Sequence, residues 1–456
     1  MNTKYISRTK KAAVNLIEGP IIKNLLLFAI PLFMGQLLQQ CYNVVDAWVV
    51  GNFADNDAFA AVSSAGSVTH LIVGLFNGIA IGGGVIISKY FGAKEEENVV
   101  KSIHTVFLFG IIASILSTIV GLILVPHMLV WMNTPANVIQ NSLSYFQIYF
   151  AGVSTVIMYN ICMSIMRALG DSVHPLYYLM CSSLVNVVLD LLFVAVFHWG
   201  VAGAAIATVI AQGLSVVLCI VRMCRLNDFT RLDFKKLHFY KEIMGEVIKQ
   251  GLPTGIQNSV ISIGNITVQT NINSFGSYAM AGVGAFSKIE GFVFLPIMSM
   301  SMSLPTFISQ NLGAKQYDRA KKGAAFGIVS GMVLAELFGI VMYFSAPSLI
   351  RIFVDTAESV QFGVTHIKVT SLFFFLLALT HCSAGVLRGC GKSFIPMVTM
   401  LAFWCGVRVA YVTTILKFVP EFQMISWAYP LTWALSSIVL VTILLRLDWT
   451  KTFVKK

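Results

Sequence analysis

Ile-Ser-Lys-Tyr-Phe-Gly-Ala-Lys at residues 87–94 recurs 221 positions later, at residues 308–315, as Ile-Ser-Gln-Asn-Leu-Gly-Ala-Lys. A second motif recurs at the same offset, and its members are Arg167, Gly170, Ser172 and Pro175, which return as Arg388, Gly391, Ser393 and Pro396. Two separate motifs that share one offset indicate that one structural unit is used twice. In an apolar chain, such a duplication is typical of secondary transporters, whose substrate site lies between the repeats.

The composition indicates a membrane protein. The 456 residues are 57% hydrophobic and only 11% charged, and their mean hydropathy is +0.80, which leaves too little charge to cover a water-exposed surface. Apolar runs of 18 residues or more recur along the chain, and each is long enough to cross a hydrocarbon layer of about 30 Å. These runs do not alternate apolar with polar residues, so they predict helices rather than strands. We therefore expect an all-α polytopic membrane protein of about twelve transmembrane helices, in two six-helix repeat lobes with a central cleft.

The longest polar stretch lies near the middle of the chain, at residues 222–249, and it is basic. We interpret it as a linker between the halves, which predicts an N-terminal lobe at 1–224, a cytoplasmic linker at 225–246 and a C-terminal lobe at 247–456. Because six helices per half is an even number, both halves enter the membrane from the same side. The repeats are therefore expected to be parallel.

The net charge of +11 reflects topology in this interpretation. If the N-terminus is cytoplasmic, almost all basic segments fall on the cytoplasmic side of the predicted spans, as the positive-inside rule requires. We therefore expect a multi-pass protein of the cell membrane with both termini in the cytoplasm, in contact with the lipid bilayer and with no nucleic-acid partner. The eight cysteines include no Cys-x-x-Cys pair, so we interpret them as packing residues rather than as a metal site.

Polar residues form a stripe on the first predicted helix of each half. Residues three, four or seven positions apart share one face of a helix. The first stripe is Gln36, Gln39 or Gln40, Asn43 and Asp46, and the second is Asn258, Ser262, Asn265 and Gln269. Hydrogen bonds between helices would account for such stripes without a substrate. Because the stripes occupy corresponding positions, we favour the interpretation that both line a water-filled substrate cavity between the halves.

Four carboxyl groups fall inside predicted spans, at Asp46, Asp190, Glu290 and Glu336. An ionised carboxylate at mid-bilayer costs roughly 2.5–3.5 kcal/mol, so such residues are functional candidates. At about 1.5 Å per residue, Asp46 and Asp190 lie roughly 9 and 12 Å from the external side. Asn186 is one turn from Asp190, and Thr208 returns to the same depth.

These four groups, Asp46, Asn186, Asp190 and Thr208, together suit a hard cation, which prefers oxygen ligands, or a proton shared by two carboxylates. The alternative is that each carboxylate is hydrogen-bonded separately for packing. Glu290 either lines the cavity or pairs with the nearby Lys288. For Glu336 we expect a polar contact with another helix.

Several of these residues occur in motifs that resemble the multidrug and toxic compound extrusion (MATE) transporters. The motifs are the stretch from Pro31 that ends Asn-Val-Val-Asp-x-x-x-Val-Gly at residues 43–51, Phe-Gly-Ala-Lys at 91–94, Arg-Ala-Leu-Gly-Asp-Ser at 167–172, and Asn-x-x-x-Asp at 186–190. The resemblance covers nearly the whole chain, including its duplicated architecture.

The resemblance implies an exporter of organic cations and drugs, driven by inward flow of Na⁺ or H⁺ through alternating access. It also implies that Asp46, Asn186, Asp190 and Thr208 bind the coupling ion, with Tyr145 nearby. One departure concerns the C-terminal half, where some members place carboxylates on the seventh and tenth helices. Here the seventh helix has none, and the tenth has His366, Lys368 and His381 instead.

Two other functions compete with drug export. A flippase for a lipid-linked precursor would be expected to line its cavity with basic residues, whereas the stripes here are neutral or acidic. An enzyme is not expected, because the sequence has no His-Glu-x-x-His or Gly-x-Ser-x-Gly motif. We expect a monomer that binds small, drug-like, cationic substrates and that has no cofactor. Na⁺ and H⁺ use the same ligand types, so both ions stay open.

Overall fold

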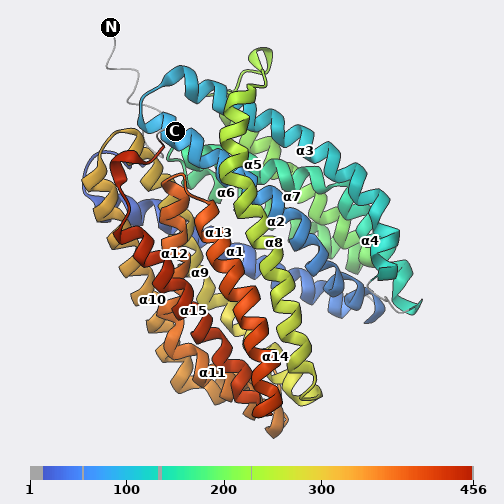
Figure 1. Cartoon of the computed structure of the whole chain (residues 1–456). Coiled ribbons are helices and arrows are strands. Elements are labelled where there is room, and N and C mark those ends of the chain that lie inside the picture. The colour runs from blue at the N-terminus through green and yellow to red at the C-terminus, as the bar shows by residue number, and fades with distance from the viewer. Residues whose placement is uncertain (1–13, 54–55, 132–135, 227, 454–456) are drawn as a thin grey trace. The chain divides into compact units, whose positions relative to one another are not determined.

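The computed structural model describes residues 14–53, 56–131, 136–226 and 228–453. These residues form helices joined by short turns, and they include no strand (Figure 1). The α-helices are α1 Ile21–Phe53, α2 Asn56–Gly92, α3 Glu96–Trp131, α4 Ala136–Ala151, α5 Val153–Ala168, α6 Val173–Asp190, α7 Gly200–Cys224, α8 Lys241–Asn273, α9 Ser277–Gly313, α10 Tyr317–Arg351, α11 Ala357–Thr370, α12 Phe374–Gly389, α13 Phe394–Met400, α14 Arg408–Phe418 and α15 Phe422–Leu445. Two π-helical segments are η1 Leu191–Val196 and η4 Leu401–Val407, and three 3₁₀ turns are η2 Phe234–Lys236, η3 Ser371–Phe373 and η5 Trp449–Lys451.

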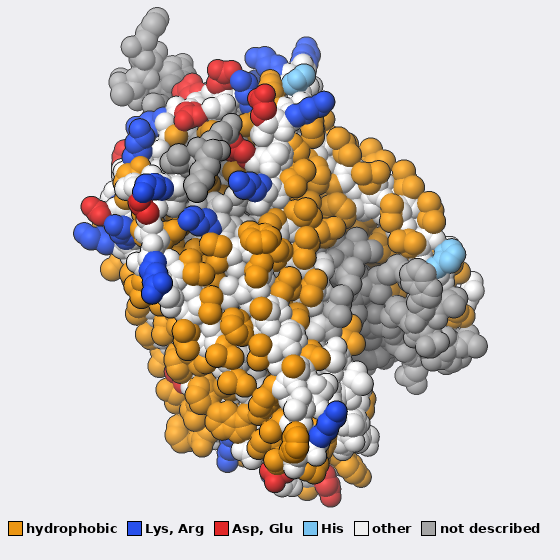
Figure 2. Space-filling view, in the orientation of Figure 1, with side chains coloured by type: hydrophobic (Ala, Val, Ile, Leu, Met, Phe, Trp, Pro, Cys, Tyr) orange, Lys and Arg blue, Asp and Glu red, His pale blue; other side chains and the backbone are white. Residues whose placement is uncertain are grey.

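Helices that can cross a membrane account for most of the described residues. Within that part of the chain, ten spans are long and apolar enough, and α4 with α5, bent by 45°, forms an eleventh. The helix α8 is as long as α1 but far more polar, and it is not among these spans. On the face drawn in Figure 2, hydrophobic side chains cover the flanks of the helices, and charged side chains gather near helix ends. This distribution suits flanks that contact lipid.

The chain packs as two compact units. Unit 1 is Met1–Asn15 with Met34–Gly255, and unit 2 is Leu16–Phe33 with Ile256–Lys456. The helices α1 and α8 each begin in one unit and end in the other, so the packing units are not identical to the predicted halves. The lobes at 1–224 and 247–456 and the linker at 225–246 stay a prediction about the repeat.

The repeated motifs adopt the same backbone conformation in both units. Lys94 and Lys315 have φ angles of 59° and 57°, and Gly170 and Gly391 have φ angles of 89° and 74°. Each of these four residues follows the end of a helix and donates its N–H to the carbonyl three residues earlier. The N–H of the next residue donates to the carbonyl five residues before it. This pattern is the Schellman end of a helix, which requires a left-handed residue. The duplicated sequence therefore encodes a duplicated helix end.

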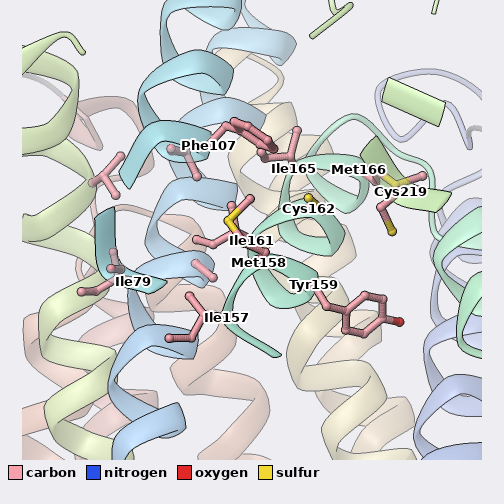
Figure 3. Close-up of a cluster of buried hydrophobic side chains, with 14 of the residues drawn as sticks. Ile79, Phe107, Ile157, Met158, Tyr159, Ile161, Cys162, Ile165, Met166 and Cys219 are labelled. Carbon is pink, nitrogen blue, oxygen red and sulfur yellow. The ribbon is translucent and has the colours of Figure 1, made fainter. Parts of the chain in front are cut away.

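The core of unit 1 forms where α2, α3, α5 and α7 meet (Figure 3). Figure 3 shows Ile157, Ile161 and Ile165 of α5 at the centre, with Phe107 of α3 and Cys219 of α7 beside them. Ile161, Ile165 and Phe107 are each no more than 1% exposed. Residues four apart share a helix face, so this stripe of α5 provides the apolar surface that the other helices cover.

Glycines allow α8 to lie directly against α2 within unit 1. A Cβ atom on Gly78 would stand 2.1 Å from the backbone nitrogen of Gly255, and one on Gly82 would stand 2.4 Å from that of Gly251. Both helices thus present a Gly-x-x-x-Gly pair to the other. Such pairs let membrane helices approach until their backbones touch, which increases van der Waals contact where lipid offers no hydrophobic driving force.

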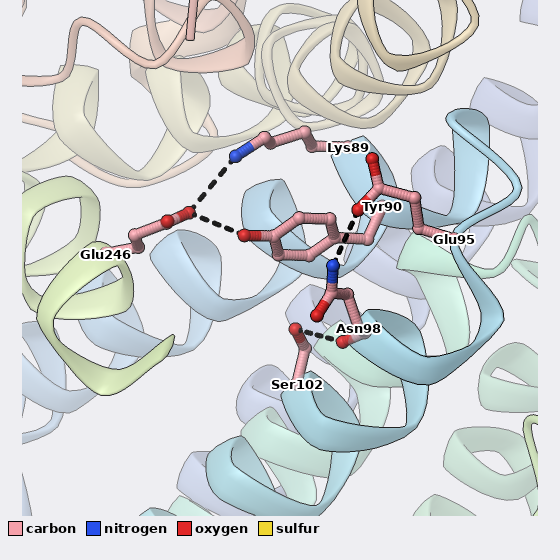
Figure 4. Close-up of polar contacts among 6 residues, drawn as sticks. All are labelled: Lys89, Tyr90, Glu95, Asn98, Ser102 and Glu246. Carbon is pink, nitrogen blue, oxygen red and sulfur yellow. Dashed lines mark hydrogen bonds and ion pairs between the residues drawn. The ribbon is translucent and has the colours of Figure 1, made fainter. Parts of the chain in front are cut away.

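A polar contact joins α2 to the first turns of α8 in the same unit (Figure 4). Lys89 Nζ lies 3.1 Å from Glu246 Oε2, and the Tyr90 hydroxyl donates to the same oxygen at 3.1 Å. The Lys89 ammonium also lies 4.4 Å from the centre of the Tyr90 ring. This polar contact is only partly exposed to solvent. It therefore helps to orient α8 against α2, in addition to the contact between their glycines.

Unit 2 holds the segment before α1 by hydrogen bonds to its backbone. Arg319 donates from Nε to the Leu16 carbonyl at 3.1 Å, and from its two Nη atoms to the Gly19 and Glu18 carbonyls at 2.6 and 3.2 Å. Asn311 also donates to the Leu16 carbonyl, at 3.2 Å. Contacts with neutral carbonyl groups need no acidic partner, and they explain why the segment packs with unit 2 despite its place in the sequence.

Glu336 of α10 has a structural partner in unit 2. Its Oε2 accepts a hydrogen bond of 3.1 Å from the backbone N–H of Phe375, in the first turn of α12. The first N–H groups of a helix lack partners inside that helix, and a carboxylate there also interacts favourably with the helix dipole. The predicted polar contact of Glu336 with another helix is therefore confirmed, and it is a helix cap.

Candidate functional site

Two carboxyl groups meet inside unit 1. Asp46 of α1 and Asp190 of α6 lie within hydrogen-bonding reach of each other. Ionised carboxylates have no donor to share, and both oxygens of Asp190 and Oδ1 of Asp46 are buried with no hydrogen-bond partner among the described residues. Asp190 is fully buried. A buried oxygen without a partner costs free energy, and a proton, a small cation or a water molecule between the oxygens would relieve that cost.

Hydroxyl groups lie near the carboxyl pair. The Tyr42 hydroxyl of α1 lies close to the Thr208 side chain of α7, which donates to the Ala204 carbonyl at 3.0 Å. Tyr145 of α4 interacts electrostatically with both Asp46 and Asp190, and its ring stacks on Tyr149 at a centroid distance of 6.1 Å. Tyr145 thus lies in the same region as the two carboxyl groups, Thr208 lies beside Tyr42, and the role of both residues at an ion site stays a prediction.

Amide groups extend the polar lining. Asn186, one turn before Asp190 on α6, is 1% exposed, and neither its amide nitrogen nor its oxygen has a hydrogen-bond partner among the described residues. The buried oxygen of Gln212, one turn after Thr208 on α7, likewise has none in that part of the chain. Several buried polar atoms without partners in one region indicate a place built for a bound species or water.

Asp190 lies where an α-helix changes into a π-helix. It is the last residue of α6, and the π-helical η1 follows at once. A π segment has a wider turn than an α-helix and is frequent at functional sites. Among the described residues, no three His, Cys, Asp or Glu side chains gather as a transition-metal site would require. Carboxyl, hydroxyl and amide oxygens are instead suited to a monovalent cation or a proton.

The polar stripes are partly or fully exposed within their own units. In unit 1, Gln36 and Gln40 are half-buried and Asn43 is exposed. In unit 2, Asn258 is half-buried, and Asn265 and Gln269 are exposed, with the Gln269 amide donating to Asn273 at 2.9 Å. This hydrogen bond of Gln269 lies within one helix, so it accounts for that polar side chain without a substrate. The substrate-cavity interpretation of the stripes stays a prediction.

Glu290 has a different neighbour from the one expected. Lys288 is exposed, whereas the charge that acts on the half-buried Glu290 is the guanidinium of Arg408 on α14. The alternative in which Glu290 pairs with Lys288 is therefore not seen, because two residues two positions apart point to different sides of a helix, and the cavity interpretation of Glu290 stays a prediction. His366 and His381 are buried in unit 2, and His366 Nδ1 lies 2.8 Å from the Ser426 hydroxyl.

Sequence reasoning did not select several residues of these regions, namely Tyr42, Tyr149, Gln212 and Arg408. Three of them lie one helical turn from a selected residue, since Tyr42 precedes Asp46 by four positions, Tyr149 follows Tyr145 by four, and Gln212 follows Thr208 by four. An extension of each candidate by one turn along its face would have found them. Arg408 could have been found as a basic residue inside an apolar run.

A family model and curated proteins match this chain over most of its length. The MatE family model matches residues 31–192 and 253–412. The chain is 26% identical over 428 residues to "Probable multidrug resistance protein YoeA" of Bacillus subtilis, which covers 92% of both proteins. It is 23% identical over 434 residues to "Multidrug export protein MepA" of Staphylococcus aureus strain MSSA476, which covers 94% of this chain and 95% of that protein.

Solved structures share the fold. One is described as the outward-facing conformation of a multidrug resistance MATE family transporter of the MOP superfamily, with a TM-score of 0.88, 18% identity, and coverage of 95% of this chain and 97% of that one. Another is a mutant of the Vibrio cholerae MATE transporter VcmN, with a TM-score of 0.87, 21% identity, and coverage of 94% of this chain and 98% of that one. At these identities the likeness establishes the arrangement of helices.

Proposed function

The chain belongs to the MatE family, and from this premise we propose that it exports small, drug-like molecules across the cell membrane in exchange for an inward-moving cation. Curated relatives named as multidrug export and resistance proteins support the export of drugs. The observation that carries the exchange is the carboxyl pair of Asp46 and Asp190, with three buried oxygens that lack partners among the described residues. Ionisable residues inside spans are costly and are functional candidates by default, so this pair is the candidate site for the coupling ion.

In this proposal Asp46 and Asp190 bind the coupling ion, Asn186 and Thr208 contribute neutral ligands, and Tyr145 lies next to the site. The drug and the ion bind alternately, because simultaneous binding would dissipate the ion gradient without export. The two sequence halves act as lobes that open in turn to each side, with both termini in the cytoplasm. The protein works as a monomer. A flippase function is not favoured, because the polar stripes carry no basic residue that would hold a pyrophosphate.

The proposed exchange predicts that an ion gradient drives export. We expect purified protein in proteoliposomes to move a fluorescent cationic dye when a Na⁺ gradient or a pH gradient is imposed, with the ion flowing opposite to the dye. Imposing the two gradients separately identifies the ion. Liposomes with neither gradient provide the control, and dye movement that is equally fast in all three conditions would contradict coupling.

The cavity interpretation predicts that water reaches both polar stripes. Single cysteines at residues 36, 43, 258 and 265, introduced in a background without the eight native cysteines, should react with a hydrophilic maleimide added from a side to which the cavity opens. A cysteine at Val333, on the apolar flank of α10, is exposed in the structure and serves as a lipid-facing control that should stay unlabelled. Protection of all four stripe positions in every transport state would favour the packing interpretation.

A further inference from the structure

A permanent positive charge lies in the interior of unit 2. Arg408 is 2% exposed and begins α14, directly after the π-helical η4. The span that contains it is Phe394–Phe418, so the guanidinium stands about 15 Å from the end of the span, at about 1.5 Å per residue. An arginine does not lose its proton in proteins, so this charge must be compensated within the unit.

Neutral groups hold the guanidinium in place. Its Nε and one Nη donate to the Thr432 hydroxyl at 3.1 and 2.8 Å. Its carbon lies 5.1 Å from the centre of the Trp404 ring and 4.5 Å from that of Tyr429, so two aromatic faces flank the cation. Cation–π contacts of this kind are strongest where water is excluded.

Glu290 is the carboxylate whose charge acts on this guanidinium. The two groups are not in direct contact, because no carboxylate oxygen of a described residue lies within 4.0 Å of Arg408. A cation and an anion in one apolar environment still stabilise each other over a longer distance than they would in water, because little solvent screens them. Glu290 is therefore a candidate counter-charge for Arg408 within unit 2.

The internal repeat relates this place to the carboxyl site of unit 1. The shared offset of 221 relates Thr208 to Tyr429, Tyr145 to His366, and Asp190 to Tyr411. Arg408 precedes Tyr411 by three positions and so lies on the same helical face. The rings of His366 and Tyr429 are 5.3 Å apart, so two of these three counterparts lie together in unit 2. Unit 1 has two carboxyl groups in this part of the repeat, whereas the corresponding part of unit 2 has the guanidinium of Arg408.

We propose that Arg408 is a tethered cation that occupies, in unit 2, the place that the mobile coupling cation takes in unit 1, with Glu290 as its counter-ion. This inference rests on the proposed function of the carboxyl pair. It makes unit 2 independent of external ions, so that only unit 1 responds to the gradient. It also predicts that, once the guanidinium is removed, unit 2 needs a cation from solution for its stability.

The test uses the full-length protein purified in detergent, with Asp46→Asn and Asp190→Asn as the parent so that unit 1 contributes no ion response. Thermal unfolding is followed by tryptophan fluorescence in choline chloride, in NaCl, and in choline chloride with millimolar guanidinium. We expect the parent to unfold at one temperature in all three. Addition of Arg408→Gln should lower the midpoint by several degrees in choline, and Na⁺ or guanidinium should restore most of the loss.

Two further variants separate charge from shape. Arg408→Lys keeps a cation and should show no new ion response, whereas Arg408→Gln with Glu290→Gln removes both charges and should regain the stability of the parent in every salt. If Arg408→Gln is too unstable to purify, recovery of folded protein by the added Glu290→Gln supports the proposal. A loss that is equal in all salts and that Glu290→Gln does not relieve would overturn it, because a structural role of Arg408 predicts that result. Gradient-driven export by the parent would instead contradict the ion site of unit 1.

Discussion

Asp190→Asn is expected to abolish gradient-driven export while the protein still folds and reaches the membrane. One cation that moves inward down about 100 mV supplies roughly 2.3 kcal/mol, which keeps a drug roughly 50-fold below its passive distribution in one-for-one exchange. The amide keeps the shape of the carboxyl group but removes its charge, so the site no longer attracts the ion. The intracellular accumulation of a dye such as ethidium, measured in cells beside the amount of protein in the membrane, should therefore rise to the level of cells that lack the transporter.

A matched control is Glu336→Gln, which neutralises another carboxylate inside a span. Glu336 accepts a hydrogen bond from a backbone N–H, and the oxygen of glutamine can accept the same bond. Export should therefore persist in this variant, with a small loss of stability at most. If Asp190→Asn exports as well as the unmodified protein at equal expression, the carboxyl pair does not couple transport.

Asp46→Asn should give the same loss, and the double substitution should be hardly worse than either single one. The two carboxyl groups lie within hydrogen-bonding reach, and the proposal makes them one site. Residues that act as a unit show strongly non-additive effects in a double-mutant cycle. Independent, additive losses would indicate two separate carboxylates, each buried for packing.

Gly78→Ala is expected to have the largest effect on folding. The added methyl carbon would stand 2.1 Å from the nitrogen and 2.4 Å from the Cα atom of Gly255, and both are backbone atoms that cannot rotate away. The helices α2 and α8 must then separate along their Gly-x-x-x-Gly contact. Overpacking of a tight contact typically costs about 1–3 kcal/mol, and a backbone clash belongs at the upper end or beyond. The melting temperature and the yield of monodisperse protein should both fall sharply.

Gly245→Ala provides the control on the same helix. A Cβ atom at Gly245 meets no other atom within 4 Å, so the substitution adds no clash. Alanine in a helix interior is favoured over glycine by roughly 0.5–1 kcal/mol, so this variant should be as stable as the unmodified protein or slightly more so. Equal stability of the Gly78→Ala and Gly245→Ala variants would mean that α2 and α8 are not held in contact by their glycines.

The class of this protein and its duplication could be predicted from the order of its residues. Apolar runs of sufficient length specify membrane helices whatever their neighbours are, and the shared offset of the Gly-Ala-Lys and Arg-Ala-Leu-Gly motifs identified the repeat. The structure confirms that repeat as left-handed residues at Lys94 and Lys315 and at Gly170 and Gly391. The membrane carboxylates could also be selected from the sequence, because an ionisable residue in an apolar run is costly wherever the helix packs.

Which of these groups meet depends on the packing of distant helices. Helical periodicity tells which residues share a face, but not which face of another helix lies opposite. For this reason the sequence offers Glu290 only Lys288, on its own helix, as a basic neighbour, whereas Arg408, more than a hundred residues later, lies near enough to act on it. The same limit hid Tyr42 beside Thr208, Gly78 against Gly255 and the segment from Leu16 in unit 2. Contacts between distant helices depend on side-chain shape and charge at the packed surface, which becomes defined only when the helices have assembled.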